Sequence, residues 1–343
     1  MTGRLPLAAL SLACALAPGR TAAEGDTPDP GVIRDVADSE AWEARLLRAS
    51  DIVRTKLITG RGDSLTIKIT YAGGWAAAFK PNHYKIRRGT REWARFPTRP
   101  FQPELAVYAL SKLVNREQYL VTVPPVVRLD LPRDLLLEQA VDDPDTARLD
   151  EIAQMRRIMR GHPGYARPAF SDAQDGMLTG YAELWMPGRP GLPGAARTRQ
   201  VWTLARHIAA LHAEEPRRDI YRQIANMFVL DYLVENNDRS PANVLHSLER
   251  DRVYLIDNDD ASFLRNRKKG YMSGFVKALG GYDPRMVRAL DGLFQDAGRA
   301  GELAAVIFAP WVSAERRGRL FAGMRAKYLG EIRPLLVRKP LLR

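Results

Sequence analysis

The sequence predicts an α+β protein of two lobes, in which a smaller, β-rich N-terminal lobe precedes a helical C-terminal lobe. Three observations indicate this class. The chain has 343 residues, more than one compact domain usually contains. Period-2 apolar alternation and turn signals are found mainly in the first half, whereas helical periodicity dominates the second half. Strands and helices that are separated along the chain in this way are typical of α+β folds.

The first residues, 1–23, are predicted to form a signal peptide. A polar start with Arg4 precedes an apolar run from Leu5 to Ala17, and small residues follow. This run is too short to span a bilayer comfortably, and no later stretch is long enough to do so. Residues 24–38 are rich in Pro, Gly and Asp and are predicted to form a flexible leader, so folding is expected to begin near Ser39.

The single cysteine, Cys14, lies inside the apolar run. Cleavage after it leaves no thiol, so disulfides and cysteine chemistry are excluded for the mature chain. Cleavage before Cys14, as in a lipoprotein, is an alternative, although Ser11-Leu12-Ala13 is a poor match to the small-residue signal. We therefore expect an exported protein without a transmembrane segment, in the periplasm or medium of a bacterium or in a eukaryotic secretory lumen.

The N-terminal lobe is predicted to span residues 39–180. Trp42, Leu46 and Ile52 have helical spacing, which predicts a helix over residues 41–55. The other elements expected in this lobe are a strand around 65–69, a turn at Gly73-Gly74, a strand over 75–79 that Pro81 ends, an irregular basic segment over 82–100, a helix from Pro103 onward, and strands over 121–129 and 178–186.

The C-terminal lobe is predicted to span residues 181–343. A Pro/Gly-rich stretch over 187–194 is the best candidate for a linker, and Trp185-Met186-Pro187 for a hinge. The elements expected after it are helices over 201–212 and 220–234, a short strand over 253–256 and a series of amphipathic helices over 286–336.

The charge of the chain favours acidic partners. Its formal net charge is +12, which suits nucleotide phosphates, anionic glycans, acidic proteins or membrane surfaces. No aromatic-and-basic recognition motif accompanies this charge, so nucleic acid is not an expected partner.

The most informative motif combines Asp238, Asn243 and Asp257. Phosphoryl transfer needs a group that orients or deprotonates the acceptor hydroxyl, together with hard oxygen ligands for Mg²⁺ or Mn²⁺. Four residues separate Asp238 from Asn243, which is the spacing of the catalytic aspartate and the metal-binding asparagine in protein kinases. Asp257 follows the apolar run Val253–Ile256 and is expected to be the second metal ligand.

Each of these residues also has a simpler interpretation. Asp238 and Asn243 are residue types that turns and helix caps favour. Lys80 ends an apolar strand and is predicted to contact phosphates, but an exposed strand end is the alternative. Glu104 is predicted to hold Lys80 from a nearby helix, although acidic residues favour first helical turns anyway. The combination of all five residues favours the kinase interpretation.

The same residues resemble the secretory-pathway kinases of the Fam20 and four-jointed type. The resemblance rests on Phe79-Lys80-Pro81, on Asp238-Arg239 with Asn243, and on Asp257-Asn258, and it covers roughly residues 65–263. It implies a kinase-like fold, ATP, a divalent metal and phosphorylation of a protein or glycan hydroxyl. The chain departs from the pattern in lacking a disulfide framework, in having Asp259-Asp260 after Asn258, and in offering no identifiable second nucleotide-contacting glutamate.

We therefore expect an exported, ATP- and metal-dependent kinase that phosphorylates a hydroxyl of a protein (Ser/Thr) or glycan acceptor, which the net charge suggests is acidic. Asp238 is assigned as the catalytic residue, Lys80 and Glu104 as nucleotide-binding residues, and Asn243 and Asp257 as ligands of Mg²⁺ or Mn²⁺. One alternative is an exported pseudokinase that binds nucleotide without turnover. Another is an intracellular kinase of the bacterial toxin or phosphoinositide type, in which residues 1–23 are part of the fold.

Overall fold

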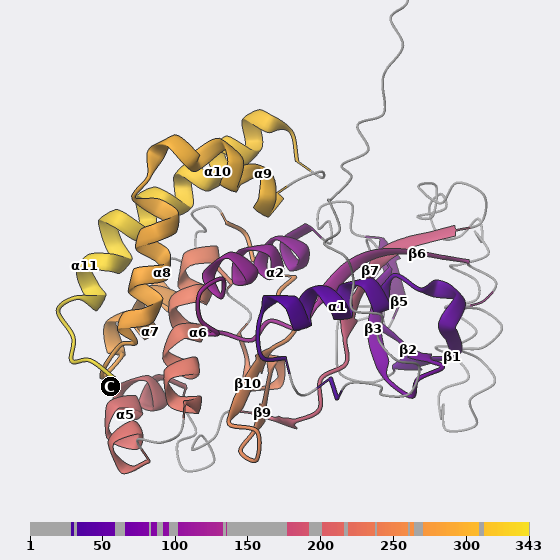
Figure 1. Ribbon diagram of the computed structural model, residues 1–343, viewed down its shortest axis with the longest axis horizontal. Helices are drawn as coiled ribbons and strands as arrows, with labels where there is room; N and C mark the ends of the chain where they lie inside the picture. Colours follow the sequence, from indigo (N-terminus) through magenta and orange to yellow (C-terminus); the bar gives the residue numbers. More distant parts are fainter. Residues whose placement is uncertain are drawn as a thin grey trace, which may run out of the picture.

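The computed structural model shows a sheet-rich lobe joined to a helical lobe (Figure 1). The residues that the structure describes are 29–30, 33–58, 66–81, 84–87, 92–95, 102–132, 135, 177–191, 201–215, 219–236, 239–259, 261–263, 270–308 and 312–342. The predicted signal peptide, residues 1–23, lies outside these ranges. None of the described helices is both long and apolar enough to cross a membrane.

The first helix, α1 (Val36–Leu46), begins within the segment that was predicted to be a leader. The Asp35 side chain caps it by accepting a hydrogen bond from the Asp38 N–H, and Ile33 just before it is only 2% exposed. The ordered fold therefore starts before Ser39. The helix also ends earlier than predicted, because the β-branched residues from Ile52 onward form strand β1 (Ile52–Ile58) instead.

The N-terminal lobe contains a five-stranded antiparallel sheet. Its strand order is β1-β2-β3-β7-β6, with β2 (Thr66–Tyr71), β3 (Ala76–Pro81), β6 (Val126–Pro132) and β7 (Met177–Leu184). The predicted hairpin joins β2 to β3, and Gly74 provides the left-handed φ of 79° that its turn requires. The predicted irregular segment contains the two-stranded hairpin of β4 (Tyr84–Arg87) and β5 (Glu92–Arg95).

The two faces of the sheet have different roles. One face packs against α1, where Trp42 meets Trp75 edge-to-face at 5.3 Å. The opposite face shares a core with helix α2 (Gln102–Val114), which also contacts the helices of the second lobe. Because β3 residue Lys80 is paired in register with Tyr181 of β7, both belong to the face that looks toward α2 and the second lobe.

The connection between the lobes begins at Trp185. Strand β7 continues through the predicted lobe boundary at residues 180 and 181, because it is hydrogen-bonded to β3 on one side and β6 on the other up to Leu184. Residues 185–188 then lead to β8 (Arg189–Pro190), which joins a second sheet with β9 (Val244–Ser247) and β10 (Arg252–Leu255).

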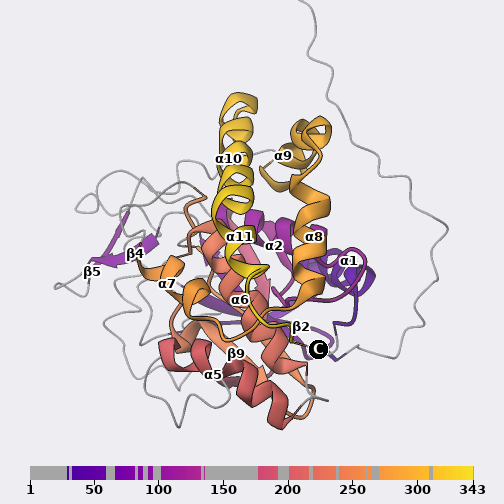
Figure 2. The ribbon, with the colours of Figure 1, turned by 90° about the vertical axis from the view of Figure 1, so that its left-hand side faces the viewer.

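The C-terminal lobe is built around a buried helix, α6 (Ile220–Val234). Helices α10 and α11 run as one column beside α8 and α9 (Figure 2). The π-helical turn Tyr328–Ile332 connects α10 to α11. The remaining helices have the bounds α5 (Val201–Glu214), α7 (Gly270–Ala278), α8 (Pro284–Phe294), α9 (Ala300–Phe308), α10 (Ala314–Lys327) and α11 (Arg333–Leu336).

Candidate active site

Residues from three distant parts of the chain meet between the lobes. The Lys80 ammonium at the end of β3 lies 2.5 Å from Oδ1 of Asp257, which follows β10. Lys80 is 8% exposed, so its charge is held in a largely buried position. Asp257 has a left-handed backbone, with φ of 56°, which is uncommon for a residue other than glycine. Such strain is often found at functional sites.

Glu104 comes to the same place from the first turn of α2. Its side chain is fully buried, and Oε1 accepts a hydrogen bond of 2.8 Å from the side-chain amide of Asn258. The direct Lys80–Glu104 pair that the sequence suggested is not formed, because Lys80 bonds Asp257 instead. Lys80 is still close enough to Glu104 to oppose the rise that burial causes in the pKa of Glu104. The carboxyl groups of Asp257 and Glu104 therefore share the field of one ammonium.

Arg239 holds the loop around Asp257 in place. Its guanidinium forms a two-pronged ion pair with Asp231 of α6, at 2.9 and 3.0 Å, and both side chains are almost completely buried. Its third nitrogen donates to the carbonyl oxygens of Asn243 and Ile256, at 2.7 and 2.8 Å. Nη2, one of the two nitrogens that bond Asp231, also donates to Oδ1 of Asn258. One residue thus connects α6, the Asn243 segment and the Asp257-Asn258 turn.

Of the two remaining predicted residues, the structure describes Asn243 but not Asp238. Asn243 ends the short 3₁₀ helix Pro241–Asn243, and its carbonyl oxygen accepts the N–H of Ile256 at 3.2 Å. It is therefore positioned beside the Asp257 turn. Asp238 lies outside the described residues, immediately before Arg239, and its catalytic role stays a prediction.

Two further residues, Glu183 and Tyr181, lie on the site face of β7 and were not predicted from the sequence. Glu183 is 5% exposed and Tyr181 is 3% exposed. The Lys80 ammonium lies 5.7 Å from the centre of the Tyr181 ring. A signal for Glu183 exists in the sequence, because it is the only charged residue in the strand from Met177 to Leu184. A carboxylate in such a strand is rarely buried without a partner.

The pKa values of the site reflect burial beside one cation. Burial lowers the pKa of Lys80, but the acidic groups around it, Tyr181, Asp257 and Asp259 first, raise it well above its ordinary value. Burial raises the pKa of Glu104 to about 7, against the opposing effect of Lys80. Burial and the neighbouring Glu104 carboxyl raise the pKa of Glu183 well above its ordinary value. The site therefore contains more carboxyl groups than Lys80 alone neutralises.

The buried oxygen atoms of this site are of the kind that bind a divalent cation. Oε2 of Glu104, Oε1 of Glu183 and the Tyr181 hydroxyl are buried and have no hydrogen-bond partner among the described residues. Orphaned carboxylate oxygens are the ligands that Mg²⁺ and Mn²⁺ prefer. No group of three His, Cys, Asp or Glu side chains in the described ranges is arranged to hold a metal alone. A metal bound with nucleotide needs only one or two carboxylates, since phosphate oxygens supply other ligands.

Two solved structures have an arrangement of elements similar to that of this chain. The Golgi casein kinase with Mn/ADP bound matches with a TM-score of 0.55 and 13% identity, over 90% of this chain and 80% of that chain. The structure of hydra Fam20 with sugar matches with a TM-score of 0.53 and 15% identity, over 90% of this chain and 93% of that chain. The chain has the fold of the Fam20 kinases.

The Fam20-like fold confirms the two-lobed, protein-kinase-like architecture and the resemblance drawn from the sequence. No family model and no curated protein matches the chain in sequence. The fold similarity therefore extends over nearly the whole chain at an identity too low for the sequences alone to match. Within this Fam20-like fold, Lys80 lies on the central sheet, Glu104 on the helix packed against it and Asp257 on the turn after β10.

Proposed function

We propose that this protein is an ATP- and divalent-metal-dependent kinase that phosphorylates a hydroxyl group of a protein (Ser/Thr) or glycan acceptor. The observation that carries the proposal is the contact between Lys80 and Asp257 across the lobes, with the buried Glu104 beside it. A lysine, a helix glutamate and a strand-following aspartate are the parts that position nucleotide phosphates and their metal in kinases.

Each residue has a distinct task in this proposal. Lys80 binds the α- and β-phosphates of ATP, and the buried carboxyl of Glu104 lies near its ammonium without bonding it directly. Asp257 and the Asn243 side chain hold Mg²⁺ or Mn²⁺, which when bound neutralises charge on the phosphates. Asp238 orients the acceptor hydroxyl and accepts its proton, so that the γ-phosphoryl group passes to the acceptor oxygen while its bond to the β,γ-bridging oxygen breaks and ADP leaves. Catalysis then depends on positioning and electrostatics rather than on a covalent intermediate.

Arg239 supports these tasks without contacting substrate. It bonds the carbonyl oxygen of Asn243, one proposed metal ligand. It also bonds Ile256 and Asn258, the two neighbours of Asp257, the other proposed ligand. Pre-organised ligands lose less entropy when the metal binds, so a rigid turn favours metal affinity. The side-chain amide of Asn258 in turn donates a hydrogen bond to Glu104 and so restrains its carboxyl group.

The proposal is tested by phosphotransfer from labelled ATP in Mg²⁺ or Mn²⁺, with protein and glycan acceptors offered in parallel. We expect a labelled acceptor with the parent protein and almost none with Lys80→Met. Arg128→Met serves as a matched control, since Arg128 lies on the same sheet and forms only a half-exposed pair with Asp130 at 3.6 Å. Metal-dependent ATP binding without transfer to any acceptor would favour the alternative of a pseudokinase.

We also propose that the protein is exported, because residues 1–23 have the pattern of a signal peptide. Terminal sequencing of the mature protein tests this. A start near Glu24 supports export, whereas an intact Met1 in an active protein supports an intracellular kinase.

A further inference from the structure

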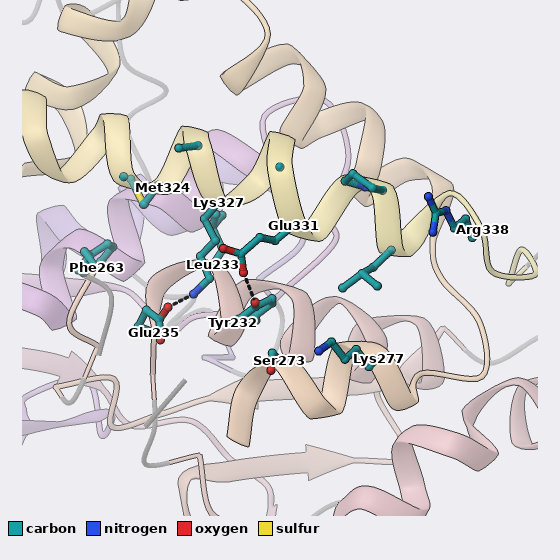
Figure 3. A pocket seen from close by; sticks show the side chains of 15 residues that line it. Tyr232, Leu233, Glu235, Phe263, Ser273, Lys277, Met324, Lys327, Glu331 and Arg338 are labelled. Atoms are coloured by element: carbon teal, nitrogen blue, oxygen red, sulfur yellow. Dashed lines mark hydrogen bonds and ion pairs between the residues drawn. The ribbon is translucent and has the colours of Figure 1, made fainter. Parts of the chain in front are cut away.

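The helical lobe contains a cavity of about 850 Å³ that shares no lining residue with the Lys80–Asp257 site (Figure 3). It lies between the last turn of α6, helix α7 and the column formed by α10, the π-helical turn and α11. Cavities of roughly 300–1,000 Å³ are the size that binds small organic molecules.

The cavity is opened by features of the α10–α11 column. The π-helical turn Tyr328–Ile332 interrupts the regular helix at the cavity, and such turns are frequent at functional sites. Gly323 and Gly330 line it from the same column. A Cβ atom at Gly330 meets no other atom within 4 Å, and one at Gly323 meets only the Phe263 carbonyl oxygen at 3.9 Å. The missing side chains at these two positions leave part of the cavity open.

The acidic residues of the lining are already bound by other lining residues. Glu235 is 4% exposed and forms an ion pair with Lys327, whose ammonium also lies 4.0 Å from the centre of the Tyr232 ring. Glu331, in the π-helical turn, accepts a hydrogen bond of 2.6 Å from the Tyr232 hydroxyl. Both carboxylates are thus satisfied from within, so a cationic ligand would gain little from them.

The lining also contains two positively charged side chains that are not bound by other lining residues. Lys277 of α7 and Arg338, which follows α11, are exposed, and neither side chain has a hydrogen-bond or ion-pair partner within the described ranges. In Figure 3 both lie on the right-hand side, away from the Lys327–Glu235 pair. The walls are otherwise largely apolar, with Phe263, Met324 and Leu335 among them.

We infer that this cavity is a second ligand site, which takes a small organic anion with an apolar or aromatic body. The body packs on the apolar walls beside Gly330, and its phosphate, sulfonate or carboxylate group binds Lys277 and Arg338. Charge-assisted hydrogen bonds of this kind are stronger than neutral ones, and arginine binds such anions through two nitrogens. The inference concerns binding and does not depend on phosphotransfer.

The test is calorimetric titration of the purified protein with phenyl phosphate, benzenesulfonate, benzoate and the neutral benzyl alcohol, with Mn²⁺ and ADP present to fill the nucleotide site. We expect one anion per protein, weaker binding of benzyl alcohol, and a rank order among the anions that identifies the preferred acidic group. Lys277→Gln with Arg338→Gln is expected to weaken binding about tenfold or more.

The control pair, Arg288→Gln with Arg316→Gln, removes the same charge from exposed positions that do not line the cavity. Gly330→Leu should weaken binding about tenfold or more, because it places a side chain where the apolar body packs. Gly318→Leu, on an exposed part of α10 with open space around it, should not. Equal weakening by both charge pairs, undiminished binding to Gly330→Leu, or no binding of any anion to the parent would each overturn the inference. If Gly330→Leu does not fold, the charge pairs still decide. Loss of binding in Lys80→Met would assign the probe to the nucleotide site and also overturn it.

Discussion

Replacing Arg239 with Met is expected to be among the most destabilising single changes in the described part of the chain. The substitution leaves the Asp231 carboxylate, which is 1% exposed, without the two hydrogen bonds that it accepts from the guanidinium. Removing one partner of a buried ion pair typically costs about 3–5 kcal/mol, because the other charge stays buried without compensation. At about 2–4 °C per kcal/mol for a protein of somewhat smaller size, this corresponds to a decrease in Tm on the order of 10 °C.

A double variant separates the cost of the stranded charge from the cost of the lost loop contacts. Burial already raises the pKa of Asp231, with Arg239 and a hydrogen bond from Asn236 opposing this, so only Asn236 still supports the carboxylate once the arginine is removed. Asp231→Leu with Arg239→Met removes both charges, and replacing a buried ion pair by apolar side chains is often neutral or stabilising. The double variant should therefore recover a large part of the lost stability. It should not recover kinase activity, because Asn243, Ile256 and Asn258 still lack their donor.

Chemical denaturation of the parent, the two single variants and the double variant measures this directly. The half-exposed pair of Arg128 and Asp130 is the control, and its removal should cost about 1 kcal/mol or less. A loss below 1 kcal/mol for Arg239→Met, or a double variant whose loss equals the sum of the single losses, would refute the reasoning, since either result means that no buried charge was stranded.

Three further predictions follow from the site and from the cavity. Burial raises the pKa of Glu104 from its ordinary value of 4.5 to about 7, so the folded state binds this proton more tightly than the unfolded state. The free energy of unfolding of the metal-free protein should therefore fall as pH rises from 4.5 to 7. Glu104→Gln should reduce this slope in denaturant titrations across that range, and an unchanged slope would contradict the assignment. Lys327→Met should cost about 3–5 kcal/mol in thermal or chemical unfolding, because it removes the ion pair of the buried Glu235 carboxylate. A loss below about 1 kcal/mol would mean that this ion pair contributes no more than an exposed one. Asp257→Asn should lower the Mn²⁺-dependent affinity for ATP, whereas Asp238→Asn should lower kcat and leave that affinity nearly unchanged. ATP titrations with and without Mn²⁺, together with turnover measurements, test both expectations. If Asp238→Asn loses the affinity and Asp257→Asn keeps it, the two roles are reversed.

Much of the fold followed from local sequence patterns. The alternation around Ile67 and Ile69 and the Gly73-Gly74 turn predicted the β2–β3 hairpin, because strand period and turn geometry are set by neighbouring residues. Boundaries were less accurate where tertiary contacts decide them. Strand β7 passes the predicted lobe boundary because both of its neighbours pair with it, and the sequence of β7 alone does not contain that information. The early start of α1 similarly depends on the burial of Ile33 against the sheet.

The sequence indicated that Lys80, Glu104 and Asp257 belong to one site, but not how they pair. Lys80, Glu104 and Asp257 were singled out by residue type and position, and all three meet between the lobes. Which carboxylate bonds the lysine depends on the left-handed turn at Asp257 and on Asn258, whose amide bonds Glu104. Glu183 was missed because its significance lies in long-range packing: its neighbours are α2 and the Asp257 turn, both distant in sequence.

The concentration of buried charge around Asp257 is itself an argument for function. Lys80, Glu104, Glu183 and Arg239 are each 8% exposed or less, and two of the carboxylate oxygens among them have no hydrogen-bond partner in the part of the chain that the structure describes. Apolar side chains of similar volume would stabilise such a position at least as well, so stability alone does not explain these charges. Local departures from good packing chemistry are expected where a protein binds or reacts. A divalent cation supplies the positive charge that this arrangement lacks, and nucleotide phosphates supply further oxygen ligands to that cation. The residues that weaken the core are therefore the ones that support the proposed kinase function.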